Sequence, residues 1–171
     1  DATRDLERIG IANQTTMLSG ESLAIAREVR ASIARRHGEA NVAAHFRTFD
    51  TICSATQERQ DAVLRLLEEP LDLMLVVGGY NSSNTTHLAA LSRERGVRTY
   101  HIEDATSIDL ETGGLRHQPM IKAAEELVPA GWLEGATRIG ITAGASTPNN
   151  KIGETVLRLC AIAGVEPLLP T

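Results

Sequence analysis

The chain has very few aromatic residues: two Phe, two Tyr and one Trp occur among its 171 residues. Its core must therefore be built mainly from Leu, Ile, Val and Ala. A hydrophobic fraction of 42% and a charged fraction of 23% are ordinary values for a globular protein. The length fits one compact domain, or one domain and part of another.

The sequence also lacks the features of several other classes of protein. Its formal net charge is −5, so it has no excess of positive charge, and we expect no nucleic-acid partner. No apolar run approaches the roughly 20 residues of a membrane span, and no signal peptide opens the sequence, so we expect no membrane partner. Two cysteines without a dense pattern indicate a reducing compartment, and we predict a cytoplasmic protein. Because the first residue is Asp1 rather than Met, we expect a processed or trimmed chain.

The most informative stretch begins with the apolar run Leu73–Val77, which predicts a strand buried on both faces, as in parallel sheets. Gly78 and Gly79 end this strand, and the polar residues Asn81–Asn84 follow before a helix-compatible segment. One helix N-cap needs a single Asn or Ser. The surplus of polar side chains beside free helix N–H groups predicts an anion pocket, most naturally for phosphate. A well-capped helix preceded by a polar loop is the alternative.

Strands alternate with helices along the whole sequence, which predicts an α/β fold with a parallel sheet and helices on both faces. Strands are expected near residues 7–12, 46–52, 72–78, 97–102 and 137–142. Helices are expected at about 19–37, 57–69 and 148–163, and another is expected to start near Asn81–Asn84, ahead of the helix-compatible segment 87–91. A short helix is expected at 119–128 in an otherwise irregular region. In the first helix the apolar face is expected to consist of Leu23, Ala26, Val29 and Ile33.

Polar turns follow four of the predicted strands, at residues 13–16, 53–56, 78–84 and 143–147. The carboxyl ends of parallel strands are where open α/β sheets bind ligands. None of the turns matches a phosphate-binding P-loop or a dinucleotide loop, and none contains Lys or Arg. A phosphate bound here would depend on backbone amides, hydroxyls and helix dipoles, and two helix N-termini with several donors suffice for a diphosphate.

The cysteines and histidines leave several interpretations open. Cys53 lies at a predicted strand end, where it is either a reactive or metal-binding thiolate or a small buried residue. Cys160 lies in an apolar helical segment and is interpreted as core packing. No other residue pairs with Cys53 at the spacing of a metal site. Of the histidines, only His87 is close to the predicted pocket, whereas the pattern places His117, like His37 and His45, at the surface.

Taken together, four segments of the chain resemble the LytB family, in order and at compatible spacing over nearly the whole length. The segments are Gly10–Met17, Phe49–Ala62, Val76–Thr85 and Thr142–Pro148. Their amino-acid sequences are most similar to the plant and cyanobacterial branch of the family. The resemblance implies a 4-hydroxy-3-methylbut-2-enyl diphosphate reductase of the non-mevalonate isoprenoid pathway. It also implies a three-domain pseudo-symmetric α/β fold with a 4Fe–4S cluster held by one cysteine from each domain.

The resemblance assigns roles to individual residues. Cys53 matches the family's last cluster cysteine, and Thr15 matches a threonine near the reacting end of the substrate. The diphosphate-binding residues of the family are matched by Ser82, Ser83, Asn84 and Ser146. The resemblance also implies an allylic diphosphate substrate and a ferredoxin- or flavodoxin-type electron donor.

By the family's plan, residues 1–50 are the end of the middle domain and residues 51–171 are the third domain, with the diphosphate-binding loops. The other two cluster cysteines, the substrate-facing histidines and a proton-delivering glutamate belong to an N-terminal half that precedes this sequence in the family. Two functions remain open: the carboxy-terminal part of the reductase, inactive alone, or a stand-alone phosphate- or diphosphate-binding module without redox activity. Retention of Cys53 and Thr15 favours the reductase.

Overall fold

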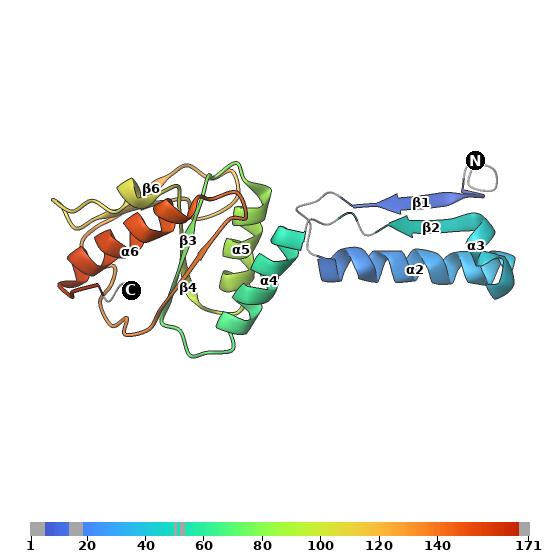
Figure 1. Cartoon of the computed structure of the whole chain (residues 1–171), viewed down its shortest axis with the longest axis horizontal. Helices are drawn as coiled ribbons and strands as arrows, with labels where there is room; N and C mark the ends of the chain where they lie inside the picture. The colour runs from blue at the N-terminus through green and yellow to red at the C-terminus, as the bar shows by residue number, and fades with distance from the viewer. Residues whose placement is uncertain (1–5, 14–18, 50, 52–53, 168–171) are drawn as a thin grey trace. The chain divides into compact units, whose positions relative to one another are not determined.

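The computed structural model describes residues 6–13, 19–49, 51 and 54–167, and the chain forms two compact units, residues 1–57 and residues 58–171 (Figure 1). Each unit has a parallel sheet and a hydrophobic core of its own. The predicted α/β class is therefore confirmed. The assignment of residues 1–50 and 51–171 to the middle and third domains of a longer protein stays a prediction.

The first unit is a parallel pair of strands joined by a long helix. Strand β1 (Ile9–Ala12) pairs with β2 (Phe46–Phe49), with Ile9 opposite Phe46. Between them lie helix α2 (Ser19–His37), the short 3₁₀ helix η1 (Glu39–Asn41) and the single-turn helix α3 (Val42–His45). As predicted, α2 ends at Gly38, whose φ of 84° places it in the left-handed region that favours glycine.

The face that α2 buries differs in part from the predicted one. Ala26 and Ile33 belong to the core of the first unit, as expected, and Val29 packs against it. Leu23, however, is 50% exposed, while its neighbour Ser22 is buried. Residues 22, 26 and 33 share one helix face because they are four and then seven positions apart, and Leu23 lies about 100° away from Ser22.

The second unit contains a parallel sheet of three strands in the order β4-β3-β7. These strands are β3 (Leu73–Val77), β4 (Arg98–Ile102) and β7 (Ile139–Ala143), and each lies where a strand was predicted. Helices α4 (Ser54–Leu66) and α5 (Ser83–Glu94) lie on one side of the sheet, and α6 (Asn149–Ala163) lies on the other (Figure 1). No helix in the described part of the chain is long and apolar enough to cross a bilayer.

Strand β3 is the centre of this unit because both of its faces are fully buried. Leu73, Leu75 and Val77 belong to a core that includes Leu159 of α6. Met74 and Val76 belong to a second core, with Val63 of α4 and Leu88 of α5. Every β3 side chain is 0% exposed. The unbroken apolar run at 73–77 is thus the signature of a central parallel strand.

The connection between β4 and β7 forms a small antiparallel hairpin in place of the predicted helix. After the 3₁₀ helix η2 (Ala105–Ser107), strand β5 (Leu115–His117) pairs with β6 (Glu126–Val128). The helix predicted at 119–128 is therefore wrong. Lys122 has a φ of 61°, which no right-handed helix accommodates. A helix of only ten residues is marginal by itself, so pairing with β5 overrides its propensity.

Candidate functional site

Two of the predicted polar turns lie side by side at the carboxyl edge of the three-stranded sheet. Strands β3 and β7 are parallel neighbours with Val77 opposite Ala143, so the turns after them start at the same level. The carbonyl of Val77 accepts hydrogen bonds from the Gly144 N–H (3.1 Å) and from the Thr147 Oγ1 hydroxyl (3.2 Å). The turn before α6 is therefore tied directly to the strand end that begins the turn before α5.

Thr85 of α5 fills the space between the two turns. A Cβ atom placed on Gly78 would lie 2.9 Å from Thr85 Oγ1, and one placed on Gly144 would clash with the same oxygen more severely. Gly78 also has a φ of 145°, a conformation that favours glycine. Both positions therefore require glycine, because α5 approaches the two strand ends too closely for a side chain.

The first turn of α5 carries the predicted serines and asparagine. Ser82 is the N-cap, and its hydroxyl oxygen accepts a hydrogen bond from the Thr85 N–H at 3.3 Å. Its backbone carbonyl accepts a bond from the Thr86 hydroxyl at 2.9 Å. The capping alternative raised by the sequence thus accounts for Ser82, but Ser83 and Asn84 are not needed for it.

Asn84 is the most unusual residue of this turn. Its side chain is only 4% exposed, and neither its amide nitrogen nor its amide oxygen has a hydrogen-bond partner among the described residues. The Thr85 hydroxyl is buried and unpartnered in the same sense. A buried polar group without a partner is costly, and native proteins rarely leave one unsatisfied. These atoms are therefore suited to a polar ligand at the N-terminus of α5, where the helix dipole favours an anion.

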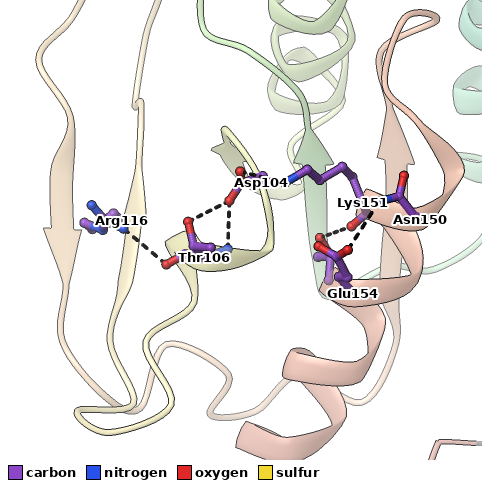
Figure 2. A network of polar contacts seen from close by, with 7 residues as sticks. Asp104, Thr106, Arg116, Asn150, Lys151 and Glu154 are labelled. Carbon is purple, nitrogen blue, oxygen red and sulfur yellow. Dashed lines mark hydrogen bonds and ion pairs between the residues drawn. The ribbon is translucent and has the colours of Figure 1, made fainter.

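The N-terminus of α6 faces the same edge and is less covered. Its N-cap is Pro148, which provides no side-chain cap, and Ser146 in the preceding turn is exposed. Lys151 in the first turn of α6 forms an ion pair with Asp104, with Nζ 3.1 Å from Oδ2 (Figure 2). The Thr106 hydroxyl donates to the same carboxylate at 2.7 Å and, with Lys151, lowers the pKa of Asp104. This pair fixes α6 against η2 and engages the ammonium group of Lys151.

A cavity of about 360 Å³ lies beside the α5 turn, between α5 and the segment that connects β5 and β6. Its lining includes Ser83 and His87 from α5, so His87 does lie next to the predicted pocket. The connecting segment contributes Gln118 and Lys122. Tyr80 completes one wall and donates a hydrogen bond to the Glu125 carboxylate at 2.8 Å. Burial, with this bond, raises the pKa of Tyr80, so its hydroxyl stays protonated at neutral pH.

The structure brings together four of the six predicted site residues at one sheet edge. Ser82, Ser83 and Asn84 open α5, and Ser146 lies in the adjoining turn before α6. Thr15 and Cys53 lie outside the described residues. Cys160 is partly buried on α6.

Several residues at this edge were missed by sequence reasoning. Thr85 and Thr147 appear as ordinary helix and turn residues, and only the sheet register brings their hydroxyls between the two strand ends. Lys122 belongs to the segment for which a helix was expected, and Gln118 immediately precedes it. His117 was predicted at the surface but is 7% exposed, because its ring, on β5, packs edge-on against the ring of Tyr100. A polar residue in a three-residue strand has no sequence signal for burial.

The described residues do not form a metal or cluster site by themselves. Among them no group of three or more His, Cys, Asp and Glu side chains is arranged to hold a metal ion. Cys160 lies far along α6 from the turns, within the helix body.

Comparison with known proteins identifies the family. The family model described as LytB protein matches residues 1–160. A curated relative from Gloeobacter violaceus, named 4-hydroxy-3-methylbut-2-enyl diphosphate reductase, is 48% identical over 170 residues, covering 96% of this chain and 39% of the relative. A relative of the same name from Synechococcus sp. strain CC9605 is 46% identical over 164 residues, covering 95% of this chain and 41% of the relative.

Solved structures agree with this result. One is a structure of (E)-4-hydroxy-3-methyl-but-2-enyl diphosphate reductase, described as the terminal enzyme of the non-mevalonate pathway. Its sequence is 35% identical to this chain and the TM-score is 0.52, and the match covers 90% of this chain and 43% of the reductase chain. A reductase structure from Plasmodium falciparum, 24% identical with a TM-score of 0.59 and covering 39% of its own chain, supports the fold alone. This chain spans about two fifths of the length of these relatives. Because the family model covers all but the last residues and the relatives match almost the whole chain, this chain belongs to the LytB family.

Proposed function

We propose that this chain is the carboxy-terminal part of a 4-hydroxy-3-methylbut-2-enyl diphosphate reductase and that it binds the diphosphate of the substrate. The observation that carries the proposal is the buried, unpartnered amide of Asn84 at the N-terminus of α5, beside the uncapped N-terminus of α6. The names of the curated relatives supply the substrate class. The family reaction removes the substrate's hydroxyl as water, using two electrons and two protons, and gives isopentenyl and dimethylallyl diphosphate.

The proposed binding site consists of Ser82, Ser83, Asn84 and Ser146. The Asn84 amide donates to a phosphate oxygen, the hydroxyls of Ser83 and Ser146 donate from the two turns, and Ser82 holds the α5 turn in shape as its cap. A hydrogen bond to a charged group contributes about 1.5–3 kcal/mol, and each helix N-terminus contributes about 0.3–1 kcal/mol. Several such donors together hold a diphosphate without a paired cation in the turns. The contribution of these two turns to catalysis is therefore orientation of the substrate by its non-reacting end.

The test of diphosphate binding is the double variant Ser83→Ala with Asn84→Ala in the full-length protein that contains this chain. Loss of two charge-assisted hydrogen bonds should weaken pyrophosphate binding well beyond tenfold, measured by titration calorimetry. Ser92→Ala is a matched control, because Ser92 lies on the same helix and its hydroxyl donates to the carbonyl of Leu88, one turn earlier. Unchanged affinity in the double variant would refute the proposed site.

We further propose that Cys53 is one of three cysteine ligands of a 4Fe–4S cluster, the other two coming from the N-terminal half of the full-length protein, and that Thr15 lies near the reacting end of the substrate. When bound, the cluster supplies electrons from a ferredoxin- or flavodoxin-type donor. The match of the LytB family model over both positions supports these assignments. The low cysteine content supports a reducing, cytoplasmic location.

The test of the cysteine assignment compares Cys53→Ser with Cys160→Ser after anaerobic reconstitution of the full-length protein. Cys53→Ser should lose the brown absorbance and the turnover of substrate, whereas Cys160→Ser should keep both, because Cys160 lies on α6 within an apolar helix. A stable cluster and normal turnover in Cys53→Ser would instead favour a phosphate- or diphosphate-binding module without redox activity.

A further inference from the structure

Behind the α5 turn lies a buried histidine that the proposed function does not use. His101 is on β4, its side chain is 1% exposed, and its ring nitrogen Nε2 lies 2.9 Å from the carbonyl oxygen of Gly78. A carbonyl oxygen only accepts hydrogen bonds, so Nε2 must carry the proton. Burial lowers the pKa of His101, with smaller contributions from Arg93 and His117, which is consistent with a neutral ring.

Gly78 is the residue at which β3 ends and the α5 turn begins. Its N–H donates to the carbonyl of Ile102 at 2.9 Å, so both of its backbone polar groups are held by β4. Two consecutive glycines, Gly78 and Gly79, leave the peptide between them unusually free to rotate. The hydrogen bond from His101 to the Gly78 carbonyl therefore restricts the rotation of this peptide, which two glycines would otherwise leave free.

The orientation of this peptide has a direct consequence for the proposed site. No peptide bond among the described residues is cis, so the Gly79 N–H points opposite to the Gly78 carbonyl. That carbonyl points to β4, and β4 and β7 lie on opposite sides of β3. The Gly79 N–H is thus directed toward the β7 side, where the turn Gly144–Pro148 lies. This is the side on which the proposed diphosphate site is formed.

We propose that His101 is a positioning residue that locks the Gly78–Gly79 peptide, so that the Gly79 N–H becomes a further donor to the bound diphosphate. The inference rests on the proposed function of the two turns and adds a backbone donor and its support to that site. The surroundings of His101 suit a fixed ring. The Tyr80 ring packs edge-on against it with centroids 5.1 Å apart, and the His101 carbonyl accepts a bond from the Gln118 N–H at 2.9 Å.

The experiment compares three variants of the full-length protein, with inorganic pyrophosphate as the probe. His101→Leu keeps approximate size and removes the donor, whereas His101→Gln places an amide N–H where Nε2 lies. His117→Leu is the matched control, because His117 is also a buried histidine packed edge-on against a tyrosine, but its ring contacts Tyr100 rather than the turn. The readouts are pyrophosphate affinity and the amide proton shift of Gly79 in ¹⁵N-resolved NMR.

In the unaltered protein, pyrophosphate should shift the Gly79 amide proton downfield. His101→Leu should lower the affinity about tenfold and abolish this shift, His101→Gln should restore most of both, and His117→Leu should leave both near their original values. Rescue by glutamine would not follow from loss of packing alone. Equal affinity in His101→Leu and the unaltered protein, or no Gly79 shift in a protein that binds pyrophosphate, would overturn the positioning role.

Two further outcomes keep the test decisive. If the unaltered protein does not bind pyrophosphate at all, the proposed function of the turns fails, and the role of His101 fails with it. If His101→Leu does not fold, imidazole ¹⁵N shifts of the unaltered protein still decide: the inference requires a proton on Nε2 and none on Nδ1. A proton on Nδ1 alone would overturn it.

Discussion

The tetrapeptide Arg-Ile-Gly-Ile occurs once in each unit, and its surroundings differ sharply between them. In the second unit it enters β7, where a Cβ atom on Gly140 would lie 2.9 Å from Leu71 Cδ1 and 3.0 Å from Met74 Sδ. In the first unit it enters β1, where no described atom lies within 4 Å of the same position on Gly10. Both copies nevertheless lie in strands that pair in parallel with a neighbour. The packing of the rest of the unit decides whether glycine is required.

The same contrast extends to the cores of the two units. Strand β3 is fully buried on both faces between α6 and the pair α4 and α5. In the first unit, β1 has no fully buried residue, and Phe46 is the one buried residue of β2. Regions with fewer buried apolar contacts open at lower free energy, so the second unit should be the more protected in hydrogen exchange.

The largest difference is expected from truncating the central strand. Leu75→Ala should destabilise the second unit by about 2–5 kcal/mol, since Leu75 is completely buried and the sheet leaves little room to collapse. The matched change Ile11→Ala in β1 should cost clearly less, because Ile11 remains partly exposed. Hydrogen exchange followed by mass spectrometry measures both units in one protein. Equal losses would contradict the assignment of β3 as the better-packed centre.

A smaller difference is expected between the two glycines of the repeated tetrapeptide. Gly140→Ala should cost about 1–3 kcal/mol, because its methyl group overpacks the contact with Leu71 and Met74. Gly10→Ala should change stability by less than about 0.5 kcal/mol, since its position is open in the described structure. Denaturant unfolding with a probe in each unit makes the comparison. An unchanged free energy of unfolding in Gly140→Ala would show that β7 does not pack tightly against Leu71 and Met74.

Acidification should weaken the second unit through its buried histidines. Burial lowers the pKa of His101 and of His117 below the ordinary value of 6.5 in the folded state. The unfolded state therefore binds more protons below about pH 6.5, so this stability is fully present above that pH and is lost as the pH falls. Unfolding measured from pH 7 to pH 5 should show a smaller loss in His101→Gln than in the unaltered protein. An identical slope in both would exclude His101 as a source of the effect.

The smallest effects are expected from the partly exposed ion pairs. Asp104→Asn removes the partner of Lys151, whose side chain is 37% exposed, and Glu39→Gln removes the partner of Arg30 in the first unit. Each change should cost less than about 1 kcal/mol, and the cost should shrink in high salt. Asp104→Asn should have the larger effect, because its carboxylate also accepts two bonds from Thr106. Thermal unfolding at low and high salt measures this, and a larger effect of Glu39→Gln would reverse the ranking.

Much of the fold could be predicted because its signals are local. Each of these signals marks an element or its end within a few residues. They are the apolar run at 73–77, the glycines at 78 and 96, and Pro148 before α6. The principal strands and helices therefore lie close to their predicted positions. The polar surplus at Asn81–Asn84 likewise pointed to one edge of the sheet, since parallel strands present their carboxyl ends together.

What the sequence by itself determined, then, is the alternation of strands and helices, the position of the polar turns and the resemblance to the LytB family. Only the tertiary structure decided that residues 126–128 form a strand, that His117 is buried and that Leu23 is exposed. It also decided that Thr85 fills the space between Gly78 and Gly144 and that His101 holds the Gly78 carbonyl. Each of these depends on contacts between residues distant in sequence. Local propensities differ by less than about 1 kcal/mol per residue, so such contacts readily override them.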